Sequence, residues 1–209
     1  MQEFIALAGI VGALSVGVVS PGPSFVLVAR VAVSTSRANG LAAALGMGLG
    51  GVVFGCAALL GLQAVLLAVP TLYLVLKVLG GLYLAYLGYR IFAGARQPLA
   101  ADTSGAGQRA SVASSFWLGF STQVSNPKTA IVYASVFAAF LPGAFSLPFA
   151  VTLLCVIFVI ESGWYAIVAV LLSSAQSRRA YLSYKAWVDR TAGFVMMGLG
   201  LKLITSAHP

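Results

Sequence analysis

The sequence predicts an all-α polytopic membrane protein in which six hydrophobic segments form two inverted three-helix repeats with proline-broken first helices. Three observations lead to this fold class. The 209 residues are 60% hydrophobic and only 8% charged, whereas soluble domains are roughly 25% charged. Several apolar runs reach the roughly 20 residues that a membrane-spanning helix needs. Proline-containing breaks also recur at matching places in the two halves of the chain.

The first three segments are expected at residues 4–34, 41–69 and 72–93. The first is apolar but is interrupted by "SPGPS", and the third contains the run "GLYLAYLGYRI". The second is rich in glycine at the small-xxx-small spacing that lets helices approach closely. Its glycines are Gly46, Gly50, Gly51 and Gly55. This spacing favours packing between helices of the chain, with a homodimer interface as the alternative.

The last three segments are expected at residues 112–141, 147–172 and 189–206. The fourth contains the second break, "SNPK". The fifth is an uninterrupted apolar run with one acidic residue, Glu161. The sixth follows the polar stretch "SSAQSRRAYLSYKAW".

Basic residues gather in the first, third and fifth connections between segments. They are Arg37, Arg90, Arg96, Arg109, Arg178, Arg179, Lys185 and Arg190. The positive-inside rule therefore places these connections in the cytoplasm and both termini outside. Lys77 and Lys202 lie near the outer side and depart from the rule. The net charge of +8 thus indicates membrane topology and not a nucleic-acid partner.

The two halves of the chain resemble each other. Pro127 lies 104 residues after Pro23. "GLYLAYLGYRI" and "GFVMMGLGLKL" each read Gly, six residues, Gly, one residue, then Arg or Lys. The predicted organisation is a first repeat at residues 1–95, a cytoplasmic linker at 96–111 and a second repeat at 112–209. Three crossings in each half make the second repeat inverted; the alternative is chance similarity among apolar segments.

The two breaks predict a binding site. Proline removes a backbone donor and clashes with the preceding turn, and irregular backbone persists in a membrane only where protein covers it or where it lines a cavity. Transporters with inverted repeats bind substrate at such discontinuous helices near the midplane. A kinked structural helix is the alternative.

The residues at the breaks suit a zwitterionic amino acid. A half-helix that begins near Pro23 or Ser24 offers its positive end to a carboxylate, and the carbonyl end of the preceding half-helix suits an ammonium. Lys128 can pair with a carboxylate or extend to the membrane interface. The candidate substrate-binding residues here are Ser20, Pro21, Gly22, Pro23, Ser24, Ser125, Asn126, Pro127 and Lys128.

Glu161 is the only acidic residue expected inside a hydrophobic segment. An ionisable residue at that depth is a functional-site hypothesis by default, and we assign Glu161 as the candidate proton carrier. The alternatives are binding of a substrate ammonium and a structural pair with Lys128. Trp164 and Tyr165 share its helical face, where they can line a cavity or pack as aromatic core.

No motif predicts an enzyme, a cofactor or a metal. The single histidine, His208, stands near the end of the chain, and no cluster of Cys, His and carboxylates resembles a metal centre. The sequence contains no phosphate-binding loop, so ATP-driven transport would need another subunit.

The chain resembles the LysE/RhtB family of bacterial amino-acid exporters. The resemblance lies in "SPGPSFVLVARVAVSTSRANGLAAALGMGLG", "GGLYLAYLGYRIF", "NPKTAIVYASVFAAFLP" and "AGFVMMGLGLKL", which follow the family's order over nearly the whole chain. It implies a small carrier of the bacterial inner membrane with six hydrophobic segments. It also implies export of amino acids driven by the proton-motive force, with amino acid, protons and lipid as partners.

Two departures from the family bear on the substrate. Ser24 stands where many relatives have Asn or Asp, and the second segment lacks the acidic residue that some relatives carry there. With Glu161 as the lone membrane acid, the sequence favours a neutral substrate of the threonine, homoserine or leucine kind. The alternatives are an exporter of basic amino acids, a cation or metal carrier, and a membrane scaffold that transports nothing.

Overall fold

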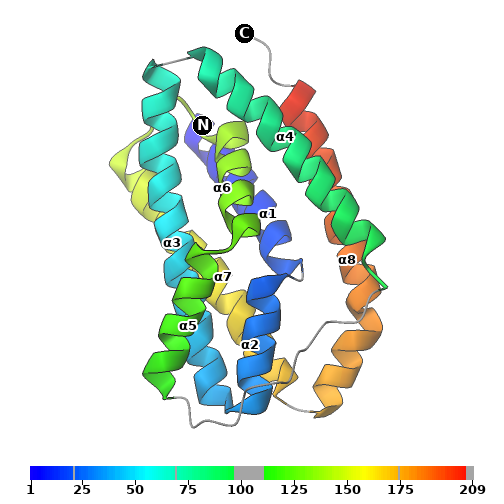
Figure 1. Ribbon diagram of the computed structural model, residues 1–209. Helices are drawn as coiled ribbons and strands as arrows, with labels where there is room; N and C mark the ends of the chain where they lie inside the picture. The colour runs from blue at the N-terminus through cyan, green and yellow to red at the C-terminus, as the bar shows by residue number, and fades with distance from the viewer. Residues whose placement is uncertain (21, 69, 97–110, 174, 206–209) are drawn as a thin grey trace.

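The computed structural model describes residues 1–20, 22–68, 70–96, 111–173 and 175–205 (Figure 1). Across these ranges the chain forms eight α-helices and no strand. The helices are α1 Gln2–Val19, α2 Pro23–Ser34, α3 Arg37–Ala68, α4 Pro70–Ala93, α5 Val112–Val124, α6 Pro127–Phe140, α7 Leu147–Leu172 and α8 Ala175–Thr205.

Both breaks divide a predicted segment into two helices. The first segment becomes α1 and α2, and the fourth becomes α5 and α6. Pro23 and Pro127 each open the second helix of their pair, because the first helical position needs no backbone N–H and favours the φ angle of proline. The sequence prediction of a half-helix that begins near Pro23 is thus confirmed.

The remaining segments match the predicted positions except the last. α7 has the predicted bounds, and α3 and α4 begin slightly earlier than expected. The predicted start of segment six at Asp189 is wrong as a helix boundary, because α8 already begins at Ala175. The stretch before Asp189 is polar but consists mainly of residues that favour helix, such as Ala, Gln, Arg, Leu and Lys. Hydropathy identifies the part of a helix suited to lipid and not its ends.

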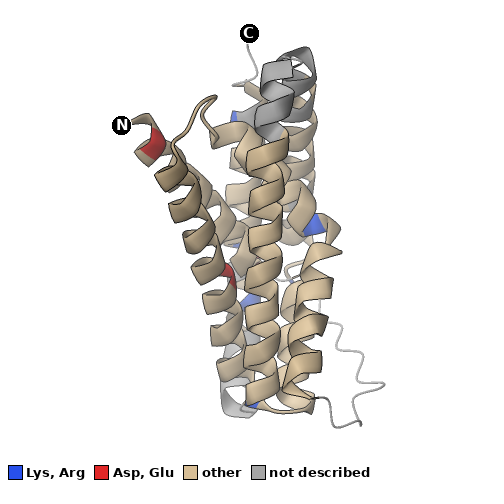
Figure 2. Cartoon of the chain, turned by 90° about the vertical axis from the view of Figure 1, so that its left-hand side faces the viewer, with Lys and Arg blue, Asp and Glu red and all other residues tan. Residues whose placement is uncertain are grey.

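Within the described ranges, three helices are long and apolar enough to cross a membrane: α1, the part Arg37–Gly61 of α3, and α7. Shorter apolar helices are α2, α6 and the part Val78–Ala93 of α4. Large apolar side chains are exposed along these helices, for example Leu60 at 75% and Val159 at 67%. Figure 2 shows how sparse charged residues are along the helices. Apolar exposure of this kind fits a membrane protein, whose solvent is lipid.

The helices pack in a pattern that brings the two breaks into contact. α3 packs against α5 and α7, and α4 lies along α8. The N-terminus lies at the same end as the last turn of α3, the first turn of α4 and the α6–α7 connection (Figure 1). The α2–α3 connection, the last turn of α7 and the first turn of α8 lie at the opposite end.

Glycine allows the closest helix contacts. A Cβ atom added to Gly46 of α3 would collide with the carbonyl oxygen of Phe116 in α5, and one added to Gly119 would collide with the carbonyl of Ala43. The prediction that the glycines of α3 serve packing is confirmed, because neighbouring helices of the same chain cover them.

The two glycine-containing runs of the predicted repeats meet across the α4–α8 contact. A Cβ added to Gly81 would lie 2.8 Å from the carbonyl oxygen of Gly200, and one added to Gly200 would lie 2.5 Å from the carbonyl oxygen of Gly81. Gly88 and Gly193 approach each other in the same way: a Cβ added to either would lie 2.6 Å from the carbonyl oxygen of the other. The first glycine of each run therefore faces the second glycine of the other.

Candidate functional site

A polar pocket lies where the two breaks meet, between two apolar clusters of the core. Leu14 and Tyr133 belong to one cluster, and Val18 and Tyr165 belong to the other. The pocket is lined by Leu14, Gly17, Val18, Ser20, Gly22, Ser24, Gln123, Asn126, Lys128, Thr129, Val132, Tyr133, Glu161 and Tyr165.

The Glu161 carboxylate is the centre of the pocket. Its side chain is buried, with the residue 2% exposed. The Tyr133 hydroxyl donates to Oε1 at 2.9 Å, and Nε2 of Gln123 donates to Oε2 at 3.0 Å. Gly51 provides the space, since a Cβ there would lie 2.9 Å from both Cγ of Glu161 and the Tyr133 hydroxyl. Each carboxylate oxygen thus has a donor, as a buried polar group requires.

Gln123 connects this carboxylate to the first break. Its Oε1 accepts a hydrogen bond of 2.6 Å from the Ser24 hydroxyl. The Asn126 side-chain amide donates in turn to the Ser24 hydroxyl at 2.9 Å. One chain of hydrogen bonds therefore joins residues from α2, α5, α7 and the α5–α6 break.

Lys128 links the second break to the first. Its ammonium donates to the carbonyl oxygen of Ser20 at 2.7 Å, and its side chain lies against Gly22. The sequence predicts that the carbonyl end of the broken helix suits an ammonium, and the ammonium found there is that of Lys128. Lys128 interacts electrostatically with Glu161, but no direct ion pair joins the two in the described part of the chain.

The two breaks differ in how their second helix is capped. The Asn126 side chain accepts from the backbone N–H of Lys128 at 3.0 Å and so caps α6. α2 starts after Gly22 without any side-chain cap. The positive end of α2 and the Lys128 ammonium therefore lie together on one side of the pocket.

A second acidic residue, which the sequence prediction does not single out, is buried besides Glu161. Asp189 in α8 is 4% exposed, and Lys185 forms an ion pair with its Oδ2 at 2.7 Å. Asp189 follows a polar stretch of sequence, so nothing local indicates that it is buried in the folded chain.

Most of the sequence-predicted site residues line the pocket. They are Ser20, Gly22, Ser24, Asn126, Lys128, Glu161 and Tyr165. Pro23, Ser125 and Pro127 are exposed and do not line it; the two prolines start helices instead. Trp164 does not line it either, although its buried Nε1 has no hydrogen-bond partner among the residues that the structure describes. Pro21 lies outside the described residues.

Three polar residues of the pocket are absent from the sequence prediction: Gln123, Thr129 and Tyr133. Gln123 could have been found, because it is a polar amide within an apolar segment three residues before Asn126. Thr129 and Tyr133 are four residues apart and share a helical face, but nothing in the sequence indicates that this face turns toward Glu161.

Replacement of Gln123 by leucine is expected to destabilise the protein. It leaves the Ser24 hydroxyl proton without its acceptor and Oε2 of Glu161 without its donor, which costs about 1–3 kcal/mol for each buried polar group. Thermal unfolding in detergent should show a clearly lower midpoint. Gln2→Leu, the same substitution at an exposed residue, is the control, and equal midpoints for the two variants would contradict the expected role.

The pocket offers hydroxyls, amides, one carboxylate and one ammonium within an apolar interior. Such a set suits a small zwitterion, whose carboxylate and ammonium each find an opposite charge. In the described part of the chain no group of three or more His, Cys, Asp or Glu residues gathers to hold a metal ion.

Comparison with known proteins supports a transport role. Residues 15–207 match the family model described as LysE type translocator. Threonine efflux proteins of Salmonella typhi and Escherichia coli K12 are each 34% identical over 192 residues, covering 91% of this chain and 93% of the relative. An uncharacterized membrane protein of Haemophilus influenzae is 29% identical over 191 residues, with 90% of both chains covered. No solved structure matches the chain.

Proposed function

The chain belongs to the LysE-type translocator family, whose members are transporters and not enzymes, and from this premise we propose that it exports a small neutral amino acid by proton antiport. The coarse function, amino-acid export across a membrane, agrees with the threonine efflux proteins among its relatives. One observation carries the finer proposal: a buried polar pocket joins both helix breaks and contains one carboxylate and one ammonium.

The two charged groups of the pocket give the substrate an orientation. We place the substrate carboxylate at the Lys128 ammonium and the uncapped start of α2, where positive charge and the helix dipole act together. We place the substrate ammonium at Glu161, which already accepts two hydrogen bonds there. The substrate enters by replacing contacts that the side chains now make with one another, so binding requires a rearrangement of the pocket.

The balance of buried charges supports a neutral substrate. Glu161 is the one carboxylate among the residues that line the pocket. A single carboxylate balances one substrate ammonium and not a second cation. Burying an unpaired charge is costly, so a zwitterion such as threonine, homoserine or leucine fits better than lysine or arginine.

Glu161 is the proposed proton carrier. It is buried in α7, at the meeting point of the two breaks, and ionisable residues at such depth commonly serve proton relays. Antiport follows if protonation of Glu161 and binding of the substrate ammonium exclude each other, because one carboxylate then carries either cation in turn.

We also propose that residues 1–95 and 112–209 are inverted repeats in a bacterial inner membrane, joined by a cytoplasmic linker at 96–111. The reciprocal contacts of Gly81 with Gly200 and of Gly88 with Gly193 support this arrangement, since a twofold axis in the membrane plane produces such pairs. The basic residues near the α2–α3 and α7–α8 connections support a cytoplasmic position for that end. Both termini then face outward.

Counterflow in proteoliposomes tests the function. The purified chain should exchange radiolabelled threonine, homoserine or leucine against unlabelled substrate, whereas lysine and arginine should exchange poorly. Protein-free liposomes give the background. Absence of counterflow across a broad amino-acid panel would favour a scaffold, and preferred exchange of lysine would favour the basic-amino-acid alternative.

A further inference from the structure

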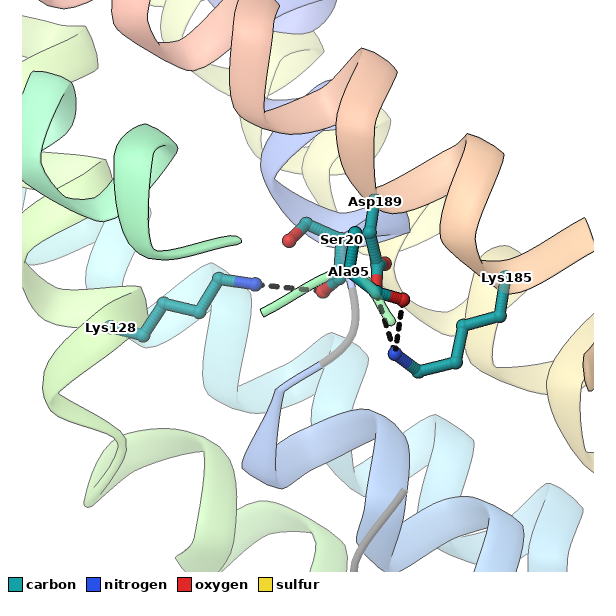
Figure 3. A network of polar contacts seen from close by, with 5 residues as sticks. All are labelled: Ser20, Ala95, Lys128, Lys185 and Asp189. Carbon is teal, nitrogen blue, oxygen red and sulfur yellow. Dashed lines mark hydrogen bonds and ion pairs between the residues drawn. The ribbon is translucent and has the colours of Figure 1, made fainter. Parts of the chain in front are cut away.

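A second polar cluster lies beside the pocket, between the end of α1 and α8 (Figure 3). The Lys185 ammonium donates to Oδ2 of Asp189 at 2.7 Å and to the carbonyl oxygen of Ala95 at 3.4 Å. In Figure 3 Lys128 reaches Ser20 from one side, while Lys185 approaches Asp189 from the other. Lys128 also interacts electrostatically with Asp189, so the cluster and the pocket form one charged system.

Two buried polar atoms of this system have no partner among the described residues. They are Oδ1 of Asp189 and the hydroxyl of Ser20, in residues that are 4% and 2% exposed. Buried polar groups are normally hydrogen-bonded, and each exception requires an explanation. A carboxylate oxygen that stays unpaired beside an ion pair is the more costly of the two.

We propose that Asp189, with Ser20, forms a second binding site for the ammonium group of the substrate, beside the pocket. The inference rests on the proposed amino-acid export. Lys185, which pairs with Asp189, also donates to the carbonyl oxygen of Ala95, which follows α4. Asp189 therefore lies where the end of α4 meets α8, and it provides a second carboxylate close to the one at Glu161.

The chemistry of the cluster already selects ammonium groups. Lys185 occupies Oδ2 of Asp189 and the Ala95 carbonyl, and Lys128 occupies the Ser20 carbonyl. Both lysines are alkylammonium groups held by oxygen atoms alone. A substrate ammonium has the same three donors and can use the remaining oxygens, Oδ1 of Asp189 and the hydroxyl of Ser20.

Lys128 connects the two ammonium sites. It interacts electrostatically with both Glu161 and Asp189. A substrate whose carboxylate stays at Lys128 can therefore move its ammonium from Asp189 to Glu161 without leaving an unpaired charge. In this step the substrate ammonium moves from the Asp189 carboxylate to the Glu161 carboxylate while the substrate carboxylate stays at Lys128. This movement carries the substrate past the helix break.

The test compares how wild-type protein and an Asp189→Asn variant recognise the ammonium group. Threonine counterflow is measured in proteoliposomes with two competitors: unlabelled threonine, and 2,3-dihydroxybutyrate, in which a hydroxyl replaces the ammonium. Asp189→Asn should raise the half-saturating threonine concentration at least about tenfold, the effect of losing one charge-assisted hydrogen bond. It should reduce the preference for threonine over dihydroxybutyrate, whereas Glu3→Gln, at a residue remote from the pocket lining, should change neither.

A double variant separates substrate binding from a purely structural role. Asp189→Asn alone leaves the buried Lys185 charge unpaired, which can unfold the protein; adding Lys185→Met removes that charge. The double variant should fold but keep the weakened threonine affinity. Recovery of wild-type affinity would overturn the proposal and make Asp189 only a partner of Lys185.

Carbodiimide labelling of the wild-type protein gives an independent answer that needs no variant. Threonine at saturating concentration should slow labelling of Asp189, and dihydroxybutyrate should not. Asp189 labelling that is the same with and without threonine would contradict the proposal. Failure of wild-type protein to exchange any amino acid would instead refute the proposed function, so the two failures are distinguishable.

Discussion

Glu161→Gln is expected to reduce proton-driven amino-acid export to the background level. Glutamine keeps the shape of the side chain and can still accept a hydrogen bond from Tyr133 or Gln123, so the pocket should remain folded. It can neither carry a proton nor bind an ammonium as a counter-ion. The loss should therefore appear in transport while the protein still reaches the membrane.

Export driven by an imposed pH gradient measures this effect, in proteoliposomes with matched amounts of folded protein. Glu3→Gln is the control, because Glu3 holds the start of α7 through Ser146 at the surface and does not line the pocket. Glu3→Gln should retain gradient-driven export. Full export by Glu161→Gln would show that a residue other than Glu161 carries the proton.

Gly46→Val is expected to cause the largest loss of stability among the glycine variants of α3. The added side chain would overlap the Phe116 carbonyl and the backbone nitrogen of Phe120 in α5. Backbone cannot rotate away as a side chain can, so α3 and α5 must separate. Overpacking of this kind costs at least about 2 kcal/mol, and α5 also supplies Gln123 to the pocket.

Gly163→Val is the matched control for this variant. Gly163 also lies within a long apolar helix, α7, but a Cβ there meets nothing within 4 Å. Thermal unfolding in detergent should give a much lower midpoint for Gly46→Val than for Gly163→Val. Similar midpoints would mean that the cost arises from valine in a helix and not from the α3–α5 contact.

The helix breaks were predictable from sequence because proline acts locally. Pro23 and Pro127 each start a helix whatever surrounds them. Ser24 and Asn126, which stand beside them, line the pocket, and their binding of substrate stays a prediction. The depth of Glu161 within an apolar run was also sufficient to predict its burial.

The contacts of these residues were not predictable, because they depend on packing between segments far apart in sequence. Nothing local indicates that Gln123 bridges Ser24 and Glu161. Tyr133 looks like an ordinary aromatic residue of an apolar helix. Asp189 is buried only because α8 lies against the end of α4, where Lys185 reaches Ala95.

The hydrogen bonds of the pocket also hold the two proposed halves of the molecule together. Ser24 of the first half forms hydrogen bonds with Gln123 and Asn126 of the second half. Lys128 of the second half donates to the carbonyl oxygen of Ser20 in the first. Neither half contains a complete set of partners. Two separately synthesised fragments, divided within residues 97–110, should consequently associate through the same atoms that we propose bind the substrate, and added substrate should favour their reassembly.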